Sequence, residues 1–285
     1  MSVECHIKGN FRIRGIRSTN PVAVGDYVQV QTLADGTKWI TDIEERRNYI
    51  IRRATNLSKE SHILAANVDQ VALIVTVNHP VTSTTFIDRF LATCEAYRVR
   101  ALLIFNKVDL LTEDELAQLD ELRALYEGIG YETLALSAIS LLPADILPKL
   151  SGKTTLLSGN SGVGKSTLLN ALFGKEVTRT GKISDAHDKG MHTTTFSEMY
   201  FLENGAVIDT PGIKGFGSVD MQKEEVSHYF RDIFAVSREC RFGNCTHTNE
   251  PGCAVQDALV RGDIAISRYE SYLSLLGDCD ESKYR

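Results

Sequence analysis

Apolar residues follow two different spacings through the middle of this chain. Residues 70–77 are apolar almost without a break, which is typical of a strand buried on both faces of a parallel sheet. Residues 86–94 place apolar side chains three and four positions apart, the spacing of an amphipathic helix. Further buried strands are predicted at 101–105, 132–136, 154–157 and 206–208. This alternation of strands and helices predicts a doubly wound α/β domain with a parallel sheet.

Leucines spaced at helical intervals between residues 116 and 125 predict another amphipathic helix in this region. Thr112 and Glu115 precede it at the spacing of an N-terminal capping box. A segment bounded by prolines, 141–150, leads to the strand at 154–157, and a helical run follows at 167–173. We interpret the apolar positions of these segments as core packing.

The first part of the chain has shorter, strand-like segments at 11–16, 26–33 and 38–43, separated by turn residues such as Asp35-Gly36. They predict a small β-barrel of the OB type. The region also has a local excess of basic residues, namely Lys8, Arg12, Arg14, Arg17, Arg46, Arg47, Arg52 and Arg53. This pattern fits a solvated barrel surface as well as an RNA-facing patch, and composition alone does not separate the two.

The last part of the chain predicts short helices at 223–234, 255–261 and 264–276, which are too small to bury a full core by themselves. Between the first two lies a cluster of metal-ligand residues: Cys240, Cys245, His247 and Cys253. Three sulfur ligands and one imidazole suit a closed, tetrahedral, structural Zn²⁺ site. We therefore expect one zinc ion per chain to hold these helices together.

Composition narrows the class of protein further. The chain has 285 residues, 43% of them hydrophobic, and a formal net charge of −6. No apolar run approaches the ~18 residues of a membrane helix, and residues 1–10 lack the apolar segment of a secretory signal. We therefore expect a cytoplasmic protein without membrane contact. The acidic charge argues against a general nucleic-acid coat, so any RNA contact should be local.

A Gly-rich loop lies between the strand at 154–157 and the helix at 167–173, and it matches a complete P-loop. Its glycines let backbone N–H groups surround a phosphate at the positive end of the following helix. Lys165 is expected to reach the β- and γ-phosphates, and the hydroxyl of Ser166 is expected to bind Mg²⁺. The predicted phosphate-binding residues are Gly159, Asn160, Ser161, Gly162, Val163, Gly164, Lys165, Ser166 and Thr167.

A second motif selects the base of the nucleotide. Asn106, Lys107, Val108 and Asp109 follow the buried strand at 101–105, at the sheet edge where ligands of open α/β sheets bind. The carboxylate of Asp109 can accept two hydrogen bonds from guanine, whereas adenine would leave it facing an acceptor. The pair Ser137 and Ala138, after the next strand, completes the predicted base pocket.

Two further motifs complete a predicted GTP site. Asp209 follows the strand at 206–208 and is expected to hold the Mg²⁺ shell, while the N–H of Gly212 contacts the γ-phosphate. Residues 192–195 occupy the place of a first switch, in which Thr194 closes over Mg²⁺.

These motifs are those of translation-factor-class GTPases, but the base motif precedes the P-loop, so their order is circularly permuted. Such a permutation is tolerable because domain termini often lie close together at the surface. With a small β-barrel before the motifs and a Cys/His cluster after them, nearly the whole chain resembles the RsgA (YjeQ/YloQ) family of GTPases that depend on the small ribosomal subunit.

The resemblance implies an OB-fold at 1–62, a permuted GTPase domain at 63–218 and a helical zinc-binding module at 219–285. It further implies a monomeric GTP hydrolase that acts with Mg²⁺ in late maturation of the 30S subunit, contacts its 16S rRNA and helps to release assembly factors. Compared with the family, the segment before 7–16 is short, which leaves open whether the barrel closes; an unclosed barrel would expose an edge strand that favours association.

The hydrolytic residue follows less directly from the motifs. Small GTPases orient the attacking water with a glutamine directly after the Asp-x-x-Gly motif, and this chain has Ile213 there. An isoleucine cannot orient water, so we expect His192 of the first switch to act with Lys165 and Thr194 in catalysis; His187 competes with it. Contacts of rRNA with Arg179, Lys182 or Lys189 would order this switch.

Two alternatives stay open at this point. The chain can act as a nucleotide-gated, rRNA-binding scaffold with vestigial hydrolysis, which turnover measured with and without 30S subunits would separate from a hydrolase. It can also be another permuted assembly GTPase that acts on the large subunit, although the barrel and the zinc cluster argue against this.

Overall fold

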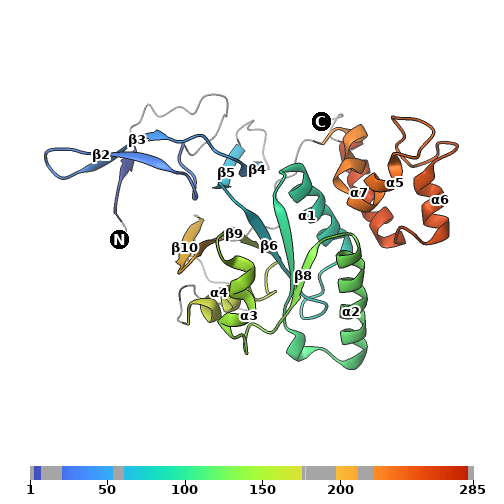
Figure 1. Ribbon diagram of the computed structural model, residues 1–285, viewed down its shortest axis with the longest axis horizontal. Helices are drawn as coiled ribbons and strands as arrows, with labels where there is room; N and C mark the ends of the chain where they lie inside the picture. Colours follow the sequence, from blue (N-terminus) through green and yellow to red (C-terminus); the bar gives the residue numbers. More distant parts are fainter. Residues whose placement is uncertain are drawn as a thin grey trace, which may run out of the picture.

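The structure is a computed structural model that describes residues 3–7, 21–53, 61–174, 177, 197–210 and 221–281. Its centre is a six-stranded sheet (Figure 1). The strands lie side by side in the order β10 (Glu198–Leu202), β11 (Gly205–Asp209), β9 (Thr154–Ser158), β6 (Gln70–Val75), β7 (Arg100–Phe105) and β8 (Glu132–Ala135). The buried strands predicted from the apolar runs are thus confirmed.

The strands predicted from the sequence pair in parallel, but a further strand, β10, pairs with β11 in the antiparallel direction, so the sheet is mixed. A two-residue turn, Glu203 and Asn204, joins these strands, and such a short connection permits only an antiparallel pair. The side chain of Phe201 in β10 is 75% exposed. Because an edge strand is buried less than the strands beside it, β10 lacks the apolar run by which the others were found.

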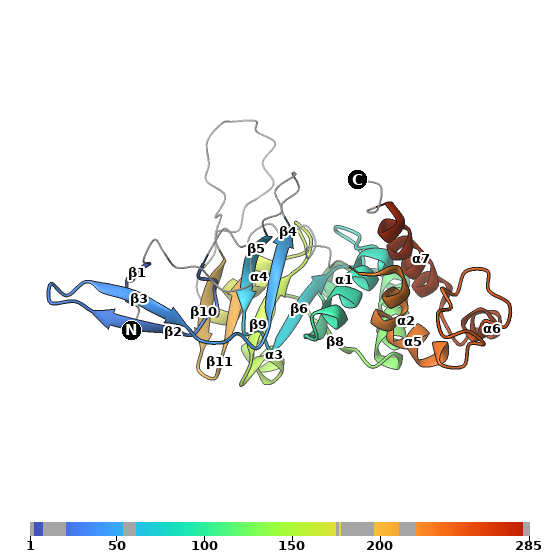
Figure 2. The same cartoon turned by 90° about the horizontal axis from the view of Figure 1, so that it is seen from above.

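Helices cover both faces of the sheet, as a doubly wound fold requires (Figure 2). Alternate residues of β6 face opposite sides. Val71 and Leu73 pack with α1 (Thr84–Ala96) and α2 (Glu113–Gly128), whereas Ile74 packs with α3 (Pro143–Leu150) and α4 (Lys165–Phe173). The capping box of α2 is confirmed, since Thr112 and Glu115 each bond the other's backbone.

The N-terminal region forms two small sheets in the part of the chain that the structure describes. One contains β1 (His6–Ile7), β3 (Lys38–Ile43) and β2 (Val28–Thr32), and it extends to one side of the molecule (Figure 1). The other pairs β4 (Tyr49–Arg53) with β5 (Ser61–Ala66). The strand expected at 11–16 lies outside the described residues, so the OB-type barrel stays a prediction.

The C-terminal region, on the other side of the sheet, contains the 3₁₀ helix η2 (Lys223–Tyr229), α5 (Arg231–Ser237), α6 (Ala254–Arg261) and α7 (Ile266–Glu281). The single helix expected at 223–234 was wrong, because Phe230 is extended, with φ −112°, and interrupts it. The Phe230 ring is fully buried and packs edge-on against the ring of Tyr272, with 5.7 Å between the ring centroids. Burial of this ring stabilises the break against the helical periodicity on either side.

These helices do not form a core by themselves, which agrees with the expectation from their small size. Their apolar core includes Ala92 of α1, and Ala96 packs against its margin. One side of α1 therefore packs against the sheet, and the other side packs against the C-terminal helices. No helix in the described ranges combines the length and apolar character needed to span a membrane.

Candidate functional site

The predicted P-loop connects the end of β9 to the start of α4. Two of its glycines permit close approaches that a side chain would prevent. A Cβ on Gly159 (φ +144°) would lie 2.3 Å from the carbonyl oxygen of Ile74, and one on Gly164 (φ +97°) would lie 2.3 Å from Asn106 Nδ2. The glycine positions therefore let the loop pack against β6 and against the predicted base motif.

Lys165 folds back over this loop. Its Nζ donates to the carbonyl oxygens of Gly159 at 2.6 Å and Asn160 at 2.8 Å. Burial lowers the pKa of Lys165, while the charge of Asp209 opposes that shift. A phosphate group placed in the loop would offer this half-buried ammonium group anionic oxygens in place of the two carbonyl oxygens.

Asn106 brings three of the predicted motifs together. Its side chain is buried, its Nδ2 donates to the carbonyl of Val163 in the P-loop at 2.8 Å, and its Oδ1 accepts from the N–H of Ala138 at 2.9 Å. Lys107 adopts a left-handed backbone conformation (φ 65°), and Val108 and Asp109 follow in the 3₁₀ helix η1 (Val108–Leu110). The exposed carboxylate of Asp109 thus lies on the same sheet edge as the phosphate loop.

Two oxygen-bearing side chains lie at that edge, the partly buried Asp209 and the buried Ser137. Burial raises the pKa of Asp209 at the end of β11, against the lowering effect of Lys165. The hydroxyl of Ser137 is buried, and the described residues offer it no hydrogen-bond partner. A buried, unpaired hydroxyl costs free energy unless a further group supplies the partner, which is consistent with a ligand beside it.

Several predicted residues lie outside the part of the chain that the structure describes. Among the site residues these are His192, Thr194 and Gly212, together with the alternative His187 and the glutamine-replacing Ile213. The basic residues Lys8, Arg12, Arg14, Arg17, Arg179, Lys182 and Lys189 also lie outside it.

The structure describes only some of the predicted magnesium ligands, because Thr194 lies outside the described residues. Ser166, in the first turn of α4, and Asp209, at the end of β11, supply the hard oxygen donors that Mg²⁺ prefers. β9 and β11 are adjacent parallel strands, with Leu157 opposite Asp209, so the P-loop and Asp209 share one edge.

The four predicted zinc ligands form a compact cluster, with ligand atoms within 4.8 Å of one another. His247 Nδ1 lies 3.6 Å from the sulfur atoms of both Cys240 and Cys253, and these sulfurs are 4.0 Å apart. A tetrahedral ion with Zn–S of about 2.3 Å and Zn–N of about 2.05 Å requires separations of about 3.6 Å (S to N) and 3.8 Å (S to S). The donor set therefore fits Zn²⁺.

The loop that carries the cluster is fixed by hydrogen bonds from the surrounding helices. Tyr269 and Tyr272 of α7 donate to the carbonyls of His247 and Thr246, each at 2.7 Å. Glu250 accepts from the backbone N–H groups of Thr246 and Thr248. Burial opposes ionisation of Glu250, but a hydrogen bond from the Thr246 hydroxyl, at 2.6 Å, together with these backbone bonds holds its pKa at about 2. The cluster is thus positioned by α7 as well as by its own loop.

Sequence reasoning missed the loop after β6. Lys107 Nζ donates to the carbonyl of His79, and Asn78 bonds Glu115 at the start of α2. Its position in the sequence could have indicated it, because this Asn-His-Pro turn follows a buried strand, and ligands of open α/β sheets bind where such strands end.

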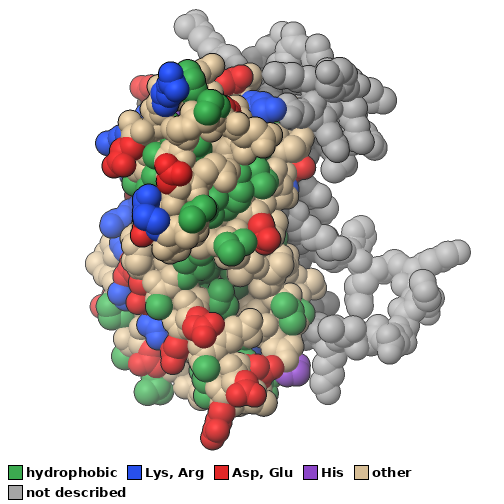
Figure 3. Space-filling model, turned by 90° about the vertical axis from the view of Figure 1, so that its right-hand side faces the viewer, with side chains coloured by type: hydrophobic (Ala, Val, Ile, Leu, Met, Phe, Trp, Pro, Cys, Tyr) green, Lys and Arg blue, Asp and Glu red, His purple; other side chains and the backbone are tan. Residues whose placement is uncertain are grey.

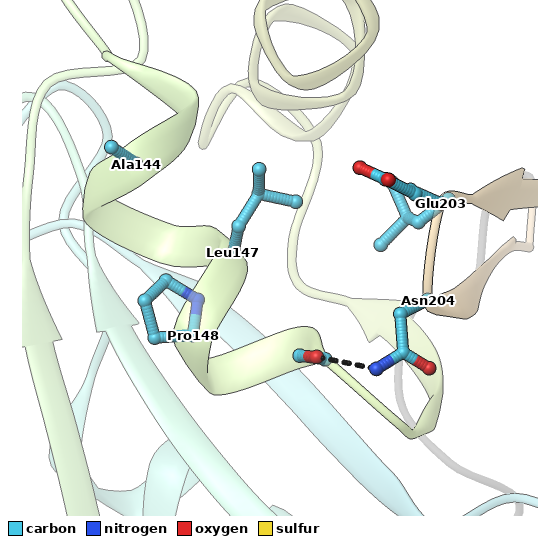
Figure 4. A pocket seen from close by; sticks show the side chains of 7 residues that line it. Ala144, Leu147, Pro148, Glu203 and Asn204 are labelled. Atoms are coloured by element: carbon cyan, nitrogen blue, oxygen red, sulfur yellow. Dashed lines mark hydrogen bonds between the residues drawn. The ribbon is translucent and has the colours of Figure 1, made fainter.

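A cavity of about 400 Å³ lies elsewhere, between α3 and the turn from β10 to β11 (Figure 4). Leu147, Pro148 and Leu202 line it, and Asn204 donates to Ser151 Oγ at 2.9 Å on one side. It adjoins the start of β11, at the sheet edge opposite the P-loop. This cavity is therefore separate from the predicted nucleotide site.

Comparison with known proteins gives a consistent result. The sequence profile of the RsgA GTPase family matches residues 43–219. Proteins named small ribosomal subunit biogenesis GTPase RsgA are 61% identical in Phocaeicola vulgatus, covering 100% of this chain and 92% of the relative, and 60% identical in Bacteroides fragilis, covering 99% and 92%.

Solved structures agree. YjeQ from Thermotoga maritima superimposes with a TM-score of 0.75 at 34% identity, covering 96% of this chain and 89% of that one. YloQ, described as a circularly permuted GTPase, superimposes with a TM-score of 0.72 at 32% identity, covering 99% and 87%. The chain therefore belongs to the RsgA GTPase family, and it is a GTP hydrolase.

Proposed function

We propose that this GTPase acts in the biogenesis of the small ribosomal subunit, binding GTP and GDP through the residues that its motifs select. The observation that carries the site assignment is Asn106, which bonds the P-loop at Val163 and the base-pocket residue Ala138 at the same time. The subunit assignment is supported by the names of relatives that are 60% or more identical over nearly the whole chain.

Each motif has a distinct role in this proposal. The backbone N–H groups of residues 159–166 surround the phosphates, and Lys165 exchanges its carbonyl partners for the β- and γ-phosphate oxygens. Asp109 accepts hydrogen bonds from guanine. Ser166, Thr194 and Asp209 would hold Mg²⁺, which neutralises charge on the phosphates when it is bound.

Hydrolysis transfers the γ-phosphoryl group to water and releases GDP and phosphate. Since Ile213 replaces the water-orienting glutamine, we assign that role to His192 in the first switch. The free protein would then hydrolyse GTP slowly, and contact with the subunit would order the switch and place His192. Release of assembly factors would follow hydrolysis.

The remaining proposals concern domains, partners and metal. Residues 1–62 form the OB-type domain, 63–218 the permuted GTPase domain and 219–285 the zinc-binding module, with one structural Zn²⁺ per chain. Both the first and the last domain would contact 16S rRNA, and the protein would act as a cytoplasmic monomer. On the face viewed from the C-terminal side, acidic and basic side chains are interspersed (Figure 3), so an RNA contact there would be local rather than spread over the whole face.

The deciding experiment compares 30S and 50S subunits. The protein loaded with a non-hydrolysable GTP analogue should cosediment with 30S subunits and not with 50S subunits, and GTP turnover should rise when 30S subunits are added. Equal binding to both subunits would reject the small-subunit assignment, and turnover unaffected by 30S would reject the gating.

A further inference from the structure

The loop after β6, residues 76–82, touches both halves of the proposed GTP site. On one side, Pro80 lies beside Gly162 of the P-loop, since a Cβ built on that glycine would be in ordinary contact with Pro80 Cδ, at 3.6 Å. On the other side, the carbonyl of His79 accepts a hydrogen bond from Lys107 Nζ of the base motif. A shift of this loop would therefore affect both the P-loop and the base motif.

Threonines close the base of this loop. The backbone N–H of Thr76 donates to Thr82 Oγ1 at 3.1 Å, and the N–H of Thr82 donates to the carbonyl of Thr76 at 3.0 Å. Both side chains are buried, and Thr76 Oγ1 also donates to the carbonyl of Pro80. These bonds fix the two ends of the loop and leave its tip, Asn78 and His79, to be positioned by other contacts.

Asn78 supplies those contacts with both ends of its side-chain amide. Its Oδ1 accepts from the N–H of His79 at 2.8 Å, and its Nδ2 donates to Glu115 Oε1. The other carboxylate oxygen, Glu115 Oε2, accepts from the N–H of Thr112 at 2.9 Å as part of the capping box of α2. Hydrogen bonds from Thr112 and then from Asn78 lower the pKa of Glu115, so a charged acceptor anchors the amide.

We propose that Asn78 is a positioning residue for guanine-nucleotide binding, which it serves by holding the His79 carbonyl in place for Lys107. This inference rests on the proposed function of the site. Lys107 follows Asn106, has a left-handed backbone and precedes Asp109 by two residues, so an ammonium group fixed on a carbonyl holds the whole base motif at the sheet edge. Loss of Asn78 frees that carbonyl and lets the base motif move.

The test measures dissociation of a fluorescent GDP analogue. In Asn78→Ala, GDP should dissociate about tenfold faster, since a hydrogen bond to a charged group is lost, while kcat at saturating GTP should stay within about twofold. Glu115→Ala removes the same hydrogen bond from the side of α2, so GDP should dissociate from it as fast as from Asn78→Ala. If Asn78→Ala does not fold, the dissociation rate of Glu115→Ala provides the test. The conservative Glu115→Gln keeps an acceptor and should restore slow dissociation.

The matched control is Thr112→Ala, which removes the side-chain cap of α2 and leaves the Asn78–Glu115 bond intact. It should lower stability without changing GDP dissociation. In a Lys107→Ala background, Asn78→Ala should have little further effect, because the route through Lys107 is already lost. A full tenfold effect there, or unchanged dissociation in Asn78→Ala, would overturn this inference alone. A parent protein that binds no guanine nucleotide would overturn the proposed function as well.

Discussion

Arg268 of α7 donates to the carboxylate of Asp88 in α1 at 2.8 Å, and both side chains are fully buried. The same guanidinium holds Asp232 of α5 through two hydrogen bonds, at 3.0 and 2.8 Å. Tyr126 of α2 donates to Asp88 from the side of the sheet, at 2.9 Å. A buried ion network thus joins the C-terminal helices to α1 and α2.

Breaking this network should destabilise the protein strongly. Arg268→Met leaves the carboxylates of Asp88 and Asp232 without their cation, and the free energy of unfolding should fall by about 3–5 kcal/mol. Urea denaturation followed by circular dichroism measures the loss. The control is Arg89→Met, which removes a surface pair with Asp278 and should cost less than about 1 kcal/mol. Equal losses in both variants would contradict the assigned role of Arg268.

Removal of P-loop side chains should abolish function and spare the fold. Lys165→Ala loses the ammonium group that bonds Gly159 and Asn160, and Ser166→Ala loses the predicted Mg²⁺ ligand. We expect kcat/KM for GTP to fall by about 10²–10³-fold, the usual effect of removing a group that stabilises developing charge. Steady-state turnover and thermal unfolding, measured together, would contradict the P-loop assignment if both variants hydrolyse GTP like the parent.

Asp109→Asn should change base preference. In the proposed site the carboxylate accepts two hydrogen bonds from guanine, each worth about 1.5–3 kcal/mol to a charged group, so GTP affinity should fall by about 10²–10⁴-fold. The new amide can donate to the O2 oxygen of xanthine, so xanthosine nucleotides should bind the variant better than guanosine nucleotides. Competition against a fluorescent nucleotide gives both affinities, and unchanged GTP affinity would place the base pocket elsewhere.

Loss of zinc should loosen the C-terminal helices and leave nucleotide binding largely intact. Chelation, or Cys245→Ser, should release about one zinc ion per chain, and metal binding in such modules contributes about 10–16 kcal/mol of folding free energy. Metal analysis with a chromogenic chelator counts the ion, and hydrogen exchange of residues 231–281 reports the loosening. The matched control is Cys279→Ser, since Cys279 lies outside the cluster. Purified protein without zinc would contradict this prediction.

The partner-gated mechanism makes its own prediction for His192. Turnover of the parent should rise by about 10²-fold or more with 30S subunits, the scale on which positioned acid–base groups act. His192→Ala should remove most of this rise while binding GTP normally, and His187→Ala, the competing histidine, serves as the comparison. Full stimulation of His192→Ala would exclude His192 as the hydrolytic residue.

Features that depend on short spacings along the chain could be predicted from the sequence alone. The apolar runs located β6, β7 and β9, the glycines and Lys165 defined the P-loop, and the cysteines with His247 defined the metal cluster. Each of these requires residues close together in the chain, because a buried strand, a phosphate loop and a chelating loop are local structures. Permuted motif order likewise needs only the order of residues along the chain, and the family match confirmed the resemblance.

Tertiary structure decided the contacts between distant segments. Asn106 to Val163, Arg268 to Asp88 and Asn78 to Glu115 join residues that lie 57, 180 and 37 positions apart, and no periodicity marks such partners. The antiparallel edge strand β10 and the break at Phe230 belong to the same class. Strand direction and the burial of a single ring depend on which element packs alongside, and that choice is made by the whole core rather than by the local sequence.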